Sequence, residues 1–136
     1  MDVRNMSFKD GLYDMVIDKA CLDAVICSDG NKANAQGMVS EIYRVLKNNG
    51  VYICLSHGKE KQRLKYLQTQ KFTIDKKEDG TYATRVPKET IGTSTNKHKD
   101  KDPEKAKNHF CYLCHKKVGG AAEVQSPAKA SVRQPA

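Results

Sequence analysis

Charged and polar side chains stand at the ends of two apolar segments. Asp18 and Lys19 follow the largely apolar run 13–17 (YDMVI), and a Ser-His-Gly sequence at 56–58 follows the run 51–55 (VYICL). In open α/β sheets, ligands bind beyond the carboxyl ends of the strands. If both runs are strands of such a sheet, these side chains lie at a ligand-binding edge.

A simpler interpretation of the same spacing stays open. Asp18 can cap the turn that follows it, with Lys19 in solvent. Asp2 becomes a third member of the group if residues 1–3 continue from an earlier strand. His57 has a position suited to a site, although loop histidines commonly have no chemical role.

The apolar pattern predicts the elements that would position these groups. Strands are expected over 13–17, 51–56, 72–75 and 109–116, helices over about 34–47 and 59–69, and either a short helix or a turn over 21–28. Such alternation is typical of an α/β fold with parallel strands and right-handed crossovers. The last strand follows a long segment without a helical pattern, so it could return antiparallel.

The helix expected over 34–47 has a clear apolar face, formed by Met38, Ile42, Val45 and Leu46. Residues 47–50 (KNNG) tolerate a left-handed backbone and should end it. Glu41, Arg44 and Arg63 are interpreted as helix-surface or packing residues.

Composition indicates one small domain with polar additions. The chain has 136 residues, and most of its large apolar side chains fall between positions 12 and 72. Residues 76–107 are rich in Lys, Asp, Glu and Thr, and residues 118–136 are small, polar and proline-containing. We therefore expect a domain over 1–117 that includes a polar insertion loop at 76–107, followed by a disordered tail at 118–136.

The formal net charge is +8, but lysines alternate with acids in the segment 97–107 (KHKDKDPEKAK) and few aromatics accompany them. This pattern argues against nucleic-acid binding. No apolar run is long enough to span a membrane, and the first residues contain no signal-peptide core. Three of the five cysteines lie within apolar segments, as reduced thiols do, so we expect a cytoplasmic, reducing location.

The segment CYLCH at 111–115 matches a haem-attachment pattern and half of a zinc site. Cys111 and Cys114 are three residues apart in an expected strand, so their side chains should point to opposite faces. No second Cys/His pair completes a set of four zinc ligands. We expect neither haem nor metal here.

Three segments together resemble the second half of class I S-adenosylmethionine-dependent methyltransferases. They are residues 2–25 (DVRNMSFKDGLYDMVIDKACLDAV), 38–58 (MVSEIYRVLKNNGVYICLSHG) and 61–67 (KQRLKYL). The group they resemble most is the methyltransferase-like proteins that include lysine methyltransferases of translation elongation factor. The resemblance covers residues 1–75 and, loosely, 108–117. It depends on the order and spacing of the segments.

The resemblance implies a partial Rossmann-like methyltransferase sheet, S-adenosylmethionine as cofactor and a protein lysine as methyl acceptor. Asp2 and Val3 would correspond to the acidic turn that holds the adenine. Asp18 and Lys19 would lie beside the methyl group and the incoming nucleophile. The Asp18 carboxylate could accept hydrogen bonds from a substrate amine or from the amino group of the cofactor, and thereby orient an in-line transfer.

This sequence also departs from the family it resembles. Ala20-Cys21 stands where Gly-Thr is usual, and the Gly-rich cofactor loop and the ribose-binding acid of the family would precede residue 1. The sequence thus predicts a sheet without its first strands, and a methyltransferase that is truncated or inactive as written. The alternative is a non-catalytic structural or interaction subunit. The expected partner is a protein substrate, or a larger protein that covers the open sheet edge.

Overall fold

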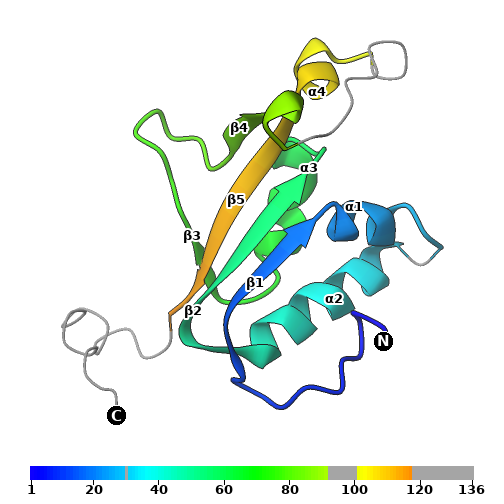
Figure 1. Cartoon of the computed structure of the whole chain (residues 1–136), viewed down its shortest axis with the longest axis vertical. Coiled ribbons are helices and arrows are strands. Elements are labelled where there is room, and N and C mark those ends of the chain that lie inside the picture. The colour runs from blue at the N-terminus through cyan, green and yellow to red at the C-terminus, as the bar shows by residue number, and fades with distance from the viewer. Residues whose placement is uncertain (30, 92–100, 118–136) are drawn as a thin grey trace.

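The computed structural model describes residues 1–29, 31–91 and 101–117 (Figure 1). The predicted tail at 118–136 lies outside the described residues, as do residues 92–100 of the predicted insertion loop. The elements are, in chain order, β1 (Tyr13–Lys19), α1 (Cys21–Ile26), α2 (Asn31–Val45), β2 (Leu46–Ser56), α3 (Glu60–Leu67), β3 (Phe72–Ile74), β4 (Thr84–Pro87), the 3-10 helix η1 (Lys88–Ile91), α4 (Pro103–Lys107) and β5 (Asn108–Lys116).

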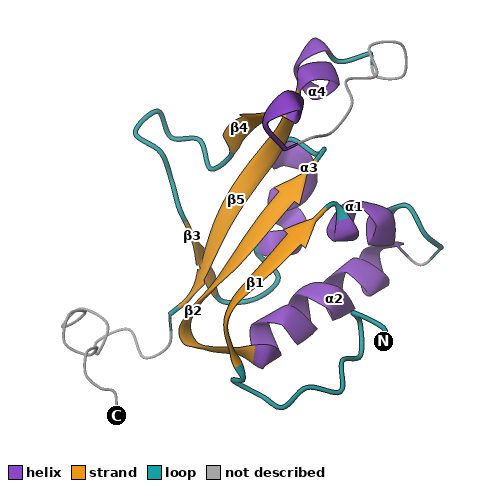
Figure 2. Ribbon diagram, in the orientation of Figure 1, coloured by secondary structure: helices purple, strands orange, loops and turns teal. Residues whose placement is uncertain are grey.

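The five strands form one mixed sheet. Its order is β1-β2-β5-β3, and β4 also pairs with β5. β1 and β2 are parallel, whereas β5 runs antiparallel to β2, β3 and β4. Figure 2 shows β5 extending along β2 through the middle of the sheet. The predicted α/β fold and the antiparallel return of the last strand are both confirmed.

One face of the sheet carries the core. Alternate residues of the two central strands are fully buried on this face, including Tyr52 and Cys54 in β2 and Tyr112 and Cys114 in β5. They join one apolar cluster with residues of three helices: Leu22 of α1; Ala35, Met38, Val39 and Ile42 of α2; and Tyr66 and Leu67 of α3. Complete burial of one large apolar side chain contributes roughly 1.5–3 kcal/mol, so this cluster is the main stabilising feature.

The opposite face is less covered among the described residues. β1 is the edge strand of the described sheet, and Met15 and Ile17, two residues apart on it, are 52% and 65% exposed. In β2 and β5 most residues on this face are only partly buried, and His109 of β5 is the buried exception among them. In the part of the chain that the structure describes, no helix combines the length and the apolar character needed to cross a membrane.

The end of α2 differs from its predicted position. The helix stops at Val45 and β2 begins at once, so residues 47–50 form an irregularity within β2. The left-handed backbone predicted for this segment is present at Asn49, with φ of 69°. The helix ends early because a tertiary contact terminates it: the Nζ of Lys116 donates to the carbonyls of Tyr43 (2.7 Å) and Leu46 (2.8 Å). A cation at this position also suits the helix dipole.

Arg44 attaches the amino-terminal segment to α2. Its guanidinium donates to the carbonyls of Met6 (3.0 Å) and Phe8 (2.7 Å) and pairs with Asp10 (2.7 Å). It also pairs with Glu41, and this hydrogen-bonded pairing lowers the pKa of Glu41 to about 2. Glu41 and Arg44 therefore have the packing role that the sequence predicted for them.

The described part of 76–107 contains more secondary structure than a polar loop. It holds β4, η1 and α4, and β4 pairs with the end of β5 that β3 does not reach. The hydrophobic pattern did not predict β4 because this four-residue edge strand is mostly exposed and polar. Its pairing with β5 depends on backbone hydrogen bonds, which leave no apolar periodicity.

Two glycine substitutions should change stability in opposite directions. A Cβ at Gly50 would lie 2.8 Å from the Lys47 carbonyl oxygen and 3.2 Å from that of Asp14, so we expect Gly50→Ala to lower the free energy of unfolding by about 1–3 kcal/mol. Gly37 lies within α2 with space for a methyl group. Gly37→Ala should therefore raise the free energy of unfolding by about 0.5–1 kcal/mol. Urea denaturation followed by circular dichroism measures both, and the reverse order would contradict this packing.

Candidate functional site

The carboxyl edge of the sheet brings together the polar residues predicted from the sequence. β1 and β2 are parallel, with Asp18 beside Cys54 and Lys19 beside Leu55. The turn that follows β2 therefore lies next to the end of β1. Because β5 is antiparallel, its amino end also reaches this edge, where Phe110 pairs with Ser56.

Asp18 is buried and fully engaged at the start of α1. It is 4% exposed, and its carboxylate accepts hydrogen bonds from the backbone N–H of Cys21 (2.6 Å) and of Leu22 (3.2 Å). It also accepts one from the Tyr52 hydroxyl (2.9 Å). Burial raises the pKa of Asp18, although these hydrogen bonds oppose the shift. The capping role that the sequence left open for Asp18 is thus present in the structure.

The residue that follows Lys19 explains a departure noted in the sequence. Ala20 has φ of 64° and ψ of 10°, and it offers no side-chain cap to α1. A left-handed backbone costs roughly 1–2 kcal/mol for a residue other than glycine. Glycine is usual at this position in the family that the sequence resembles, and glycine has no such cost. Asp18 supplies the cap from two residues earlier.

An apolar groove of about 320 Å³ extends along the free edge of β1. It is lined mainly by apolar side chains from the amino-terminal segment, β1 and α2, and Asp18 and Lys19 lie at its polar end. Val3 is also part of the lining, so three of the four predicted site residues share one groove. Asp2 is not among the lining residues. Its carboxylate pairs with Arg4 (2.6 Å), and this hydrogen bonding lowers the pKa of Asp2 to about 2.

A second buried acid, Asp23, holds the turn after β2. Its carboxylate accepts hydrogen bonds from the Ser56 hydroxyl and from the backbone N–H of His57 (2.8 Å). The Arg63 guanidinium binds the same carboxylate at 2.9 and 3.0 Å and donates to Ser56 Oγ at 2.7 Å. A side chain at Gly58 would displace the Arg63 guanidinium from its place beside Asp23.

Sequence reasoning did not identify Asp23. A possible signal was an acid one helical turn after the strand end, followed later by an arginine in the next helix. The pairing itself joins residues 40 positions apart, so the local pattern could not reveal it. Arg63, predicted as a packing residue, does pack, but through a nearly buried ion pair.

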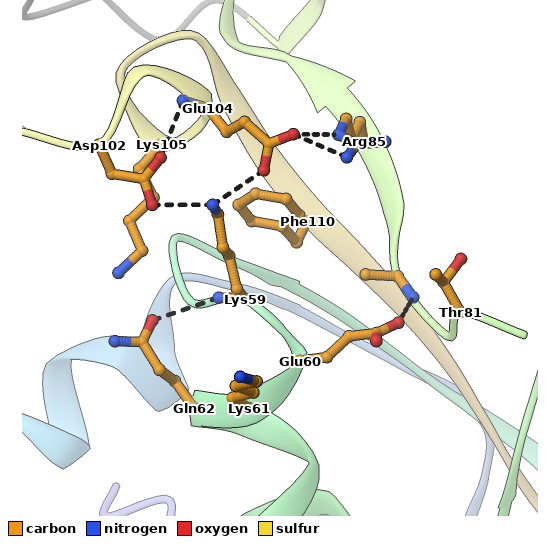
Figure 3. Close-up of a pocket in the computed structure, with 11 residues that line it drawn as sticks. Lys59, Glu60, Lys61, Gln62, Thr81, Arg85, Asp102, Glu104, Lys105 and Phe110 are labelled. Atoms are coloured by element: carbon orange, nitrogen blue, oxygen red, sulfur yellow. Dashed lines mark hydrogen bonds and ion pairs between the residues drawn. The ribbon is translucent and has the colours of Figure 1, made fainter.

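A larger polar pocket of about 520 Å³ lies between the start of α3, the 81–85 segment and α4 (Figure 3). Four of its charged side chains pair with one another. Lys59 binds Asp102 (2.8 Å) and Glu104 (2.9 Å), and Arg85 binds Glu104 (2.7 Å). Figure 3 shows Lys59 extending between these carboxylates beside Phe110. Because the opposite charges neutralise one another, the pocket selects no evident charged ligand.

The two cysteines of the CYLCH segment point to opposite faces of the sheet, as predicted. Cys114 is buried on the core face, whereas Cys111 is partly exposed on the other.

Comparison with known proteins gives a consistent result. Residues 1–54 match a protein family described as a methyltransferase domain. The eEF1A lysine and N-terminal methyltransferases of Bos taurus and Homo sapiens are each 40% identical over 58 residues. These residues are 41% of this chain, and the match covers 8% of the length of each relative.

Solved structures extend the likeness to the rest of the fold. An S-adenosylmethionine-dependent methyltransferase from Methanosarcina mazei has 12% identity and a TM-score of 0.50, over 88% of this chain and 66% of the other. The [4+2]-cyclase SpnF has 13% identity and a TM-score of 0.53, over 88% of this chain and 56% of the other. Identities this low establish the fold alone.

Residues 1–54 are therefore similar to a methyltransferase domain, and the chain shares the fold of S-adenosylmethionine-dependent methyltransferases, as the sequence resemblance predicted. The eEF1A lysine and N-terminal methyltransferases are among the proteins that its first part resembles. The catalytic and cofactor-binding roles of Asp18, Lys19, Asp2 and Val3 stay predictions.

Replacing Asp18 should test the cap. Asp18→Asn removes acceptor capacity at a buried position that serves two amides and one hydroxyl, so we expect a loss of about 2–4 kcal/mol in unfolding free energy. Asp14→Asn is the matched control, because Asp14 lies on the same strand, is 85% exposed and should change stability by less than about 0.5 kcal/mol. Equal effects in denaturant titrations would refute the capping role.

The difference in stability between the wild type and Asp18→Asn should also depend on pH. Burial raises the folded-state pKa of Asp18 above the ordinary value of 3.8. The stability that this shift contributes to the folded state is therefore fully present below pH 3.8, and it is lost as the pH rises through the folded-state pKa. Asparagine does not titrate. The stability difference between the wild type and Asp18→Asn should therefore narrow as the pH rises above about 4.

Ala20→Gly should stabilise the chain by about 0.5–1 kcal/mol, because glycine relieves the left-handed strain but loses more chain entropy on folding. Ala24→Gly, in the interior of α1, should instead destabilise it by about 1 kcal/mol. Thermal and urea unfolding measure both variants. A destabilised Ala20→Gly would be inconsistent with the backbone described for this residue.

Proposed function

We propose that this chain takes part in S-adenosylmethionine-dependent methyl transfer to an amino group of a protein, with a lysine side chain as the favoured acceptor. The observation that carries the proposal is that the segment similar to methyltransferases contains Asp18 and Lys19, which lie at the carboxyl edge of parallel strands and at one end of an apolar groove. The relatives named as lysine and N-terminal methyltransferases support a protein amine as the acceptor.

The groove has the chemistry that such a cofactor requires. Its walls are apolar, which suits a flat adenine ring, and a carboxylate lies at its end, which suits a cationic centre. Val3 would contact the ring, with Asp2 beyond it at the amino-terminal turn. When bound, S-adenosylmethionine supplies a methyl group attached to a positively charged sulfur. Asp18 and Lys19 would then lie at the reacting end.

Asp18 is assigned a positioning role within this proposal. Its oxygens are engaged by α1 and Tyr52, so it fixes the end of β1 relative to the turn. Lys19, exposed next to it, would contribute positive charge where an amine arrives. A nearby positive charge favours the neutral form of an amine, and only the neutral form has the lone pair that attacks a methyl group.

The second candidate function is a non-catalytic interaction subunit. It is favoured by the edge position of β1 and by the exposure of Met15 and Ile17, which a larger protein partner could cover. The fold is compatible with other roles, since one similar structure is named as a cyclase. Both candidates agree with the predicted cytoplasmic, reducing location, and the five cysteines form no disulfide.

Isothermal titration with S-adenosylmethionine tests the first candidate. We expect one-to-one binding by the full chain, and at least a tenfold weaker affinity for Val3→Asp, which places a charge in the apolar wall. Asp14→Asn should bind like the wild type, because its side chain faces solvent. The absence of heat at about 1 mM ligand would remove the cofactor site from the proposal and favour the interaction subunit.

A further inference from the structure

Two histidines meet at the carboxyl edge of the sheet. His57 directly follows β2. His109 lies near the start of β5 and pairs with Val86 of β4, the strand on the side of β5 away from β2. Their ring centroids are 4.2 Å apart, with an interplanar angle of 47°. Cys111, two residues further along β5, is on the sheet face opposite the core, so His109 belongs to that face as well.

His109 is buried without the partners that its ring requires. It is 2% exposed, and neither ring nitrogen has a hydrogen-bond partner among the described residues. A neutral imidazole has one donor and one acceptor nitrogen, and a buried nitrogen left without a hydrogen-bond partner destabilises the folded state. Buried polar groups in this condition call for a bound water, ion or ligand.

The charges around this pair are mainly positive. Lys88, which follows β4, is only 6% exposed, and both Lys88 and Lys19, the last residue of β1, act on His109 as positive charges. Burial lowers the pKa of His109, and His57, Lys88 and Lys19 act in the same direction. Asp23 of α1 opposes them, but its carboxylate is already bound by Arg63.

We propose that His57, His109, Lys88 and Lys19 form a binding site for an oxyanion, namely the carboxylate or phosphate group of a ligand. Oxyanion oxygens accept hydrogen bonds from imidazole N–H groups, and the two ammonium groups balance the negative charge. A metal cation is disfavoured because both lysines would repel it, and no group of three metal-ligating side chains gathers within the described residues. His57 is partly exposed and Lys19 is exposed, so a ligand enters from their side.

This site goes beyond the proposed methyl transfer and does not depend on it. If both proposals hold, an acidic group of the substrate is held at the same edge of the sheet as Asp18 and Lys19. An anion that binds the pair also favours protonated imidazoles. Binding therefore strengthens as the pH falls from about 7 to about 6.

The test is a histidine NMR titration of the full chain. The Cε1–Hε1 signals are followed from about pH 5.5 to about pH 8 in about 10 mM inorganic phosphate, and against sodium chloride of the same ionic strength. We expect phosphate to move the Cε1–Hε1 signals of both His57 and His109 and to raise the pKa of His109 by about half a unit or more. His115, near the other end of β5 and paired with Asp75 at 2.8 Å, is the internal control and should not move.

A second arm replaces phosphate with glutarate, so the two arms distinguish a phosphate ligand from a carboxylate ligand. Lys88→Met should weaken binding at least about fivefold, whereas Lys32→Met, on the exposed start of α2, should leave it unchanged. If Lys88→Met fails to fold, the titration of the wild-type chain still shows whether the two histidines bind an anion.

Two results would overturn the proposal. One is no shift of either histidine with both anions, which leaves water as the partner of His109. The other is an equal shift of His115, which indicates a general ion effect. The same sample is also titrated with S-adenosylmethionine. Because cofactor binding and anion binding are then measured separately, failure of one proposal can be told apart from failure of the other.

Discussion

The geometry of the site depends on the burial of one carboxylate where three elements join. Asp18 ends an apolar strand, accepts hydrogen bonds from the first amides of α1 and binds the Tyr52 hydroxyl of the neighbouring strand. A buried carboxylate is stable only when its oxygens have such partners. Its contacts therefore connect the end of β1 to β2 and fix the direction in which the chain leaves the sheet. The adjacent left-handed Ala20 is held by the same contacts.

A second acid completes the edge. Asp23 lies five residues after Asp18 and holds the turn after β2 through Ser56, His57 and Arg63. The short segment that contains both acids thus organises the ends of two parallel strands. Around it the chemistry divides between two faces. On the core face lie the carboxylates and their donors, whereas His57, His109 and Lys19 lie on the less covered face, where a ligand can reach His57 and Lys19 from solvent.

The exposed edge of β1 connects the fold with the proposed functions. Apolar residues such as Met15 and Ile17 are exposed on a strand whose inner side is well packed. Exposed apolar residues beside a groove commonly mark a surface where ligand or protein is bound. Both candidate functions use this surface, the first for a cofactor and a protein substrate, the second for a covering partner. They differ in whether the groove holds a small molecule.

The sequence alone determined the α/β class, the approximate strands and helices, the likeness to methyltransferases and the edge at which Asp18 and Lys19 meet the turn after β2. These features depend on local periodicity and on the rule that parallel strands end at one edge. Only the tertiary structure decided that β5 lies between β2 and β3, that β4 pairs beside it, and that α2 stops early at the Lys116 contact. It also decided the Asp23–Arg63 pair and the meeting of His57 with His109. Such contacts join residues tens of positions apart, and their free energy depends on burial and orientation, which no local pattern of residue types contains.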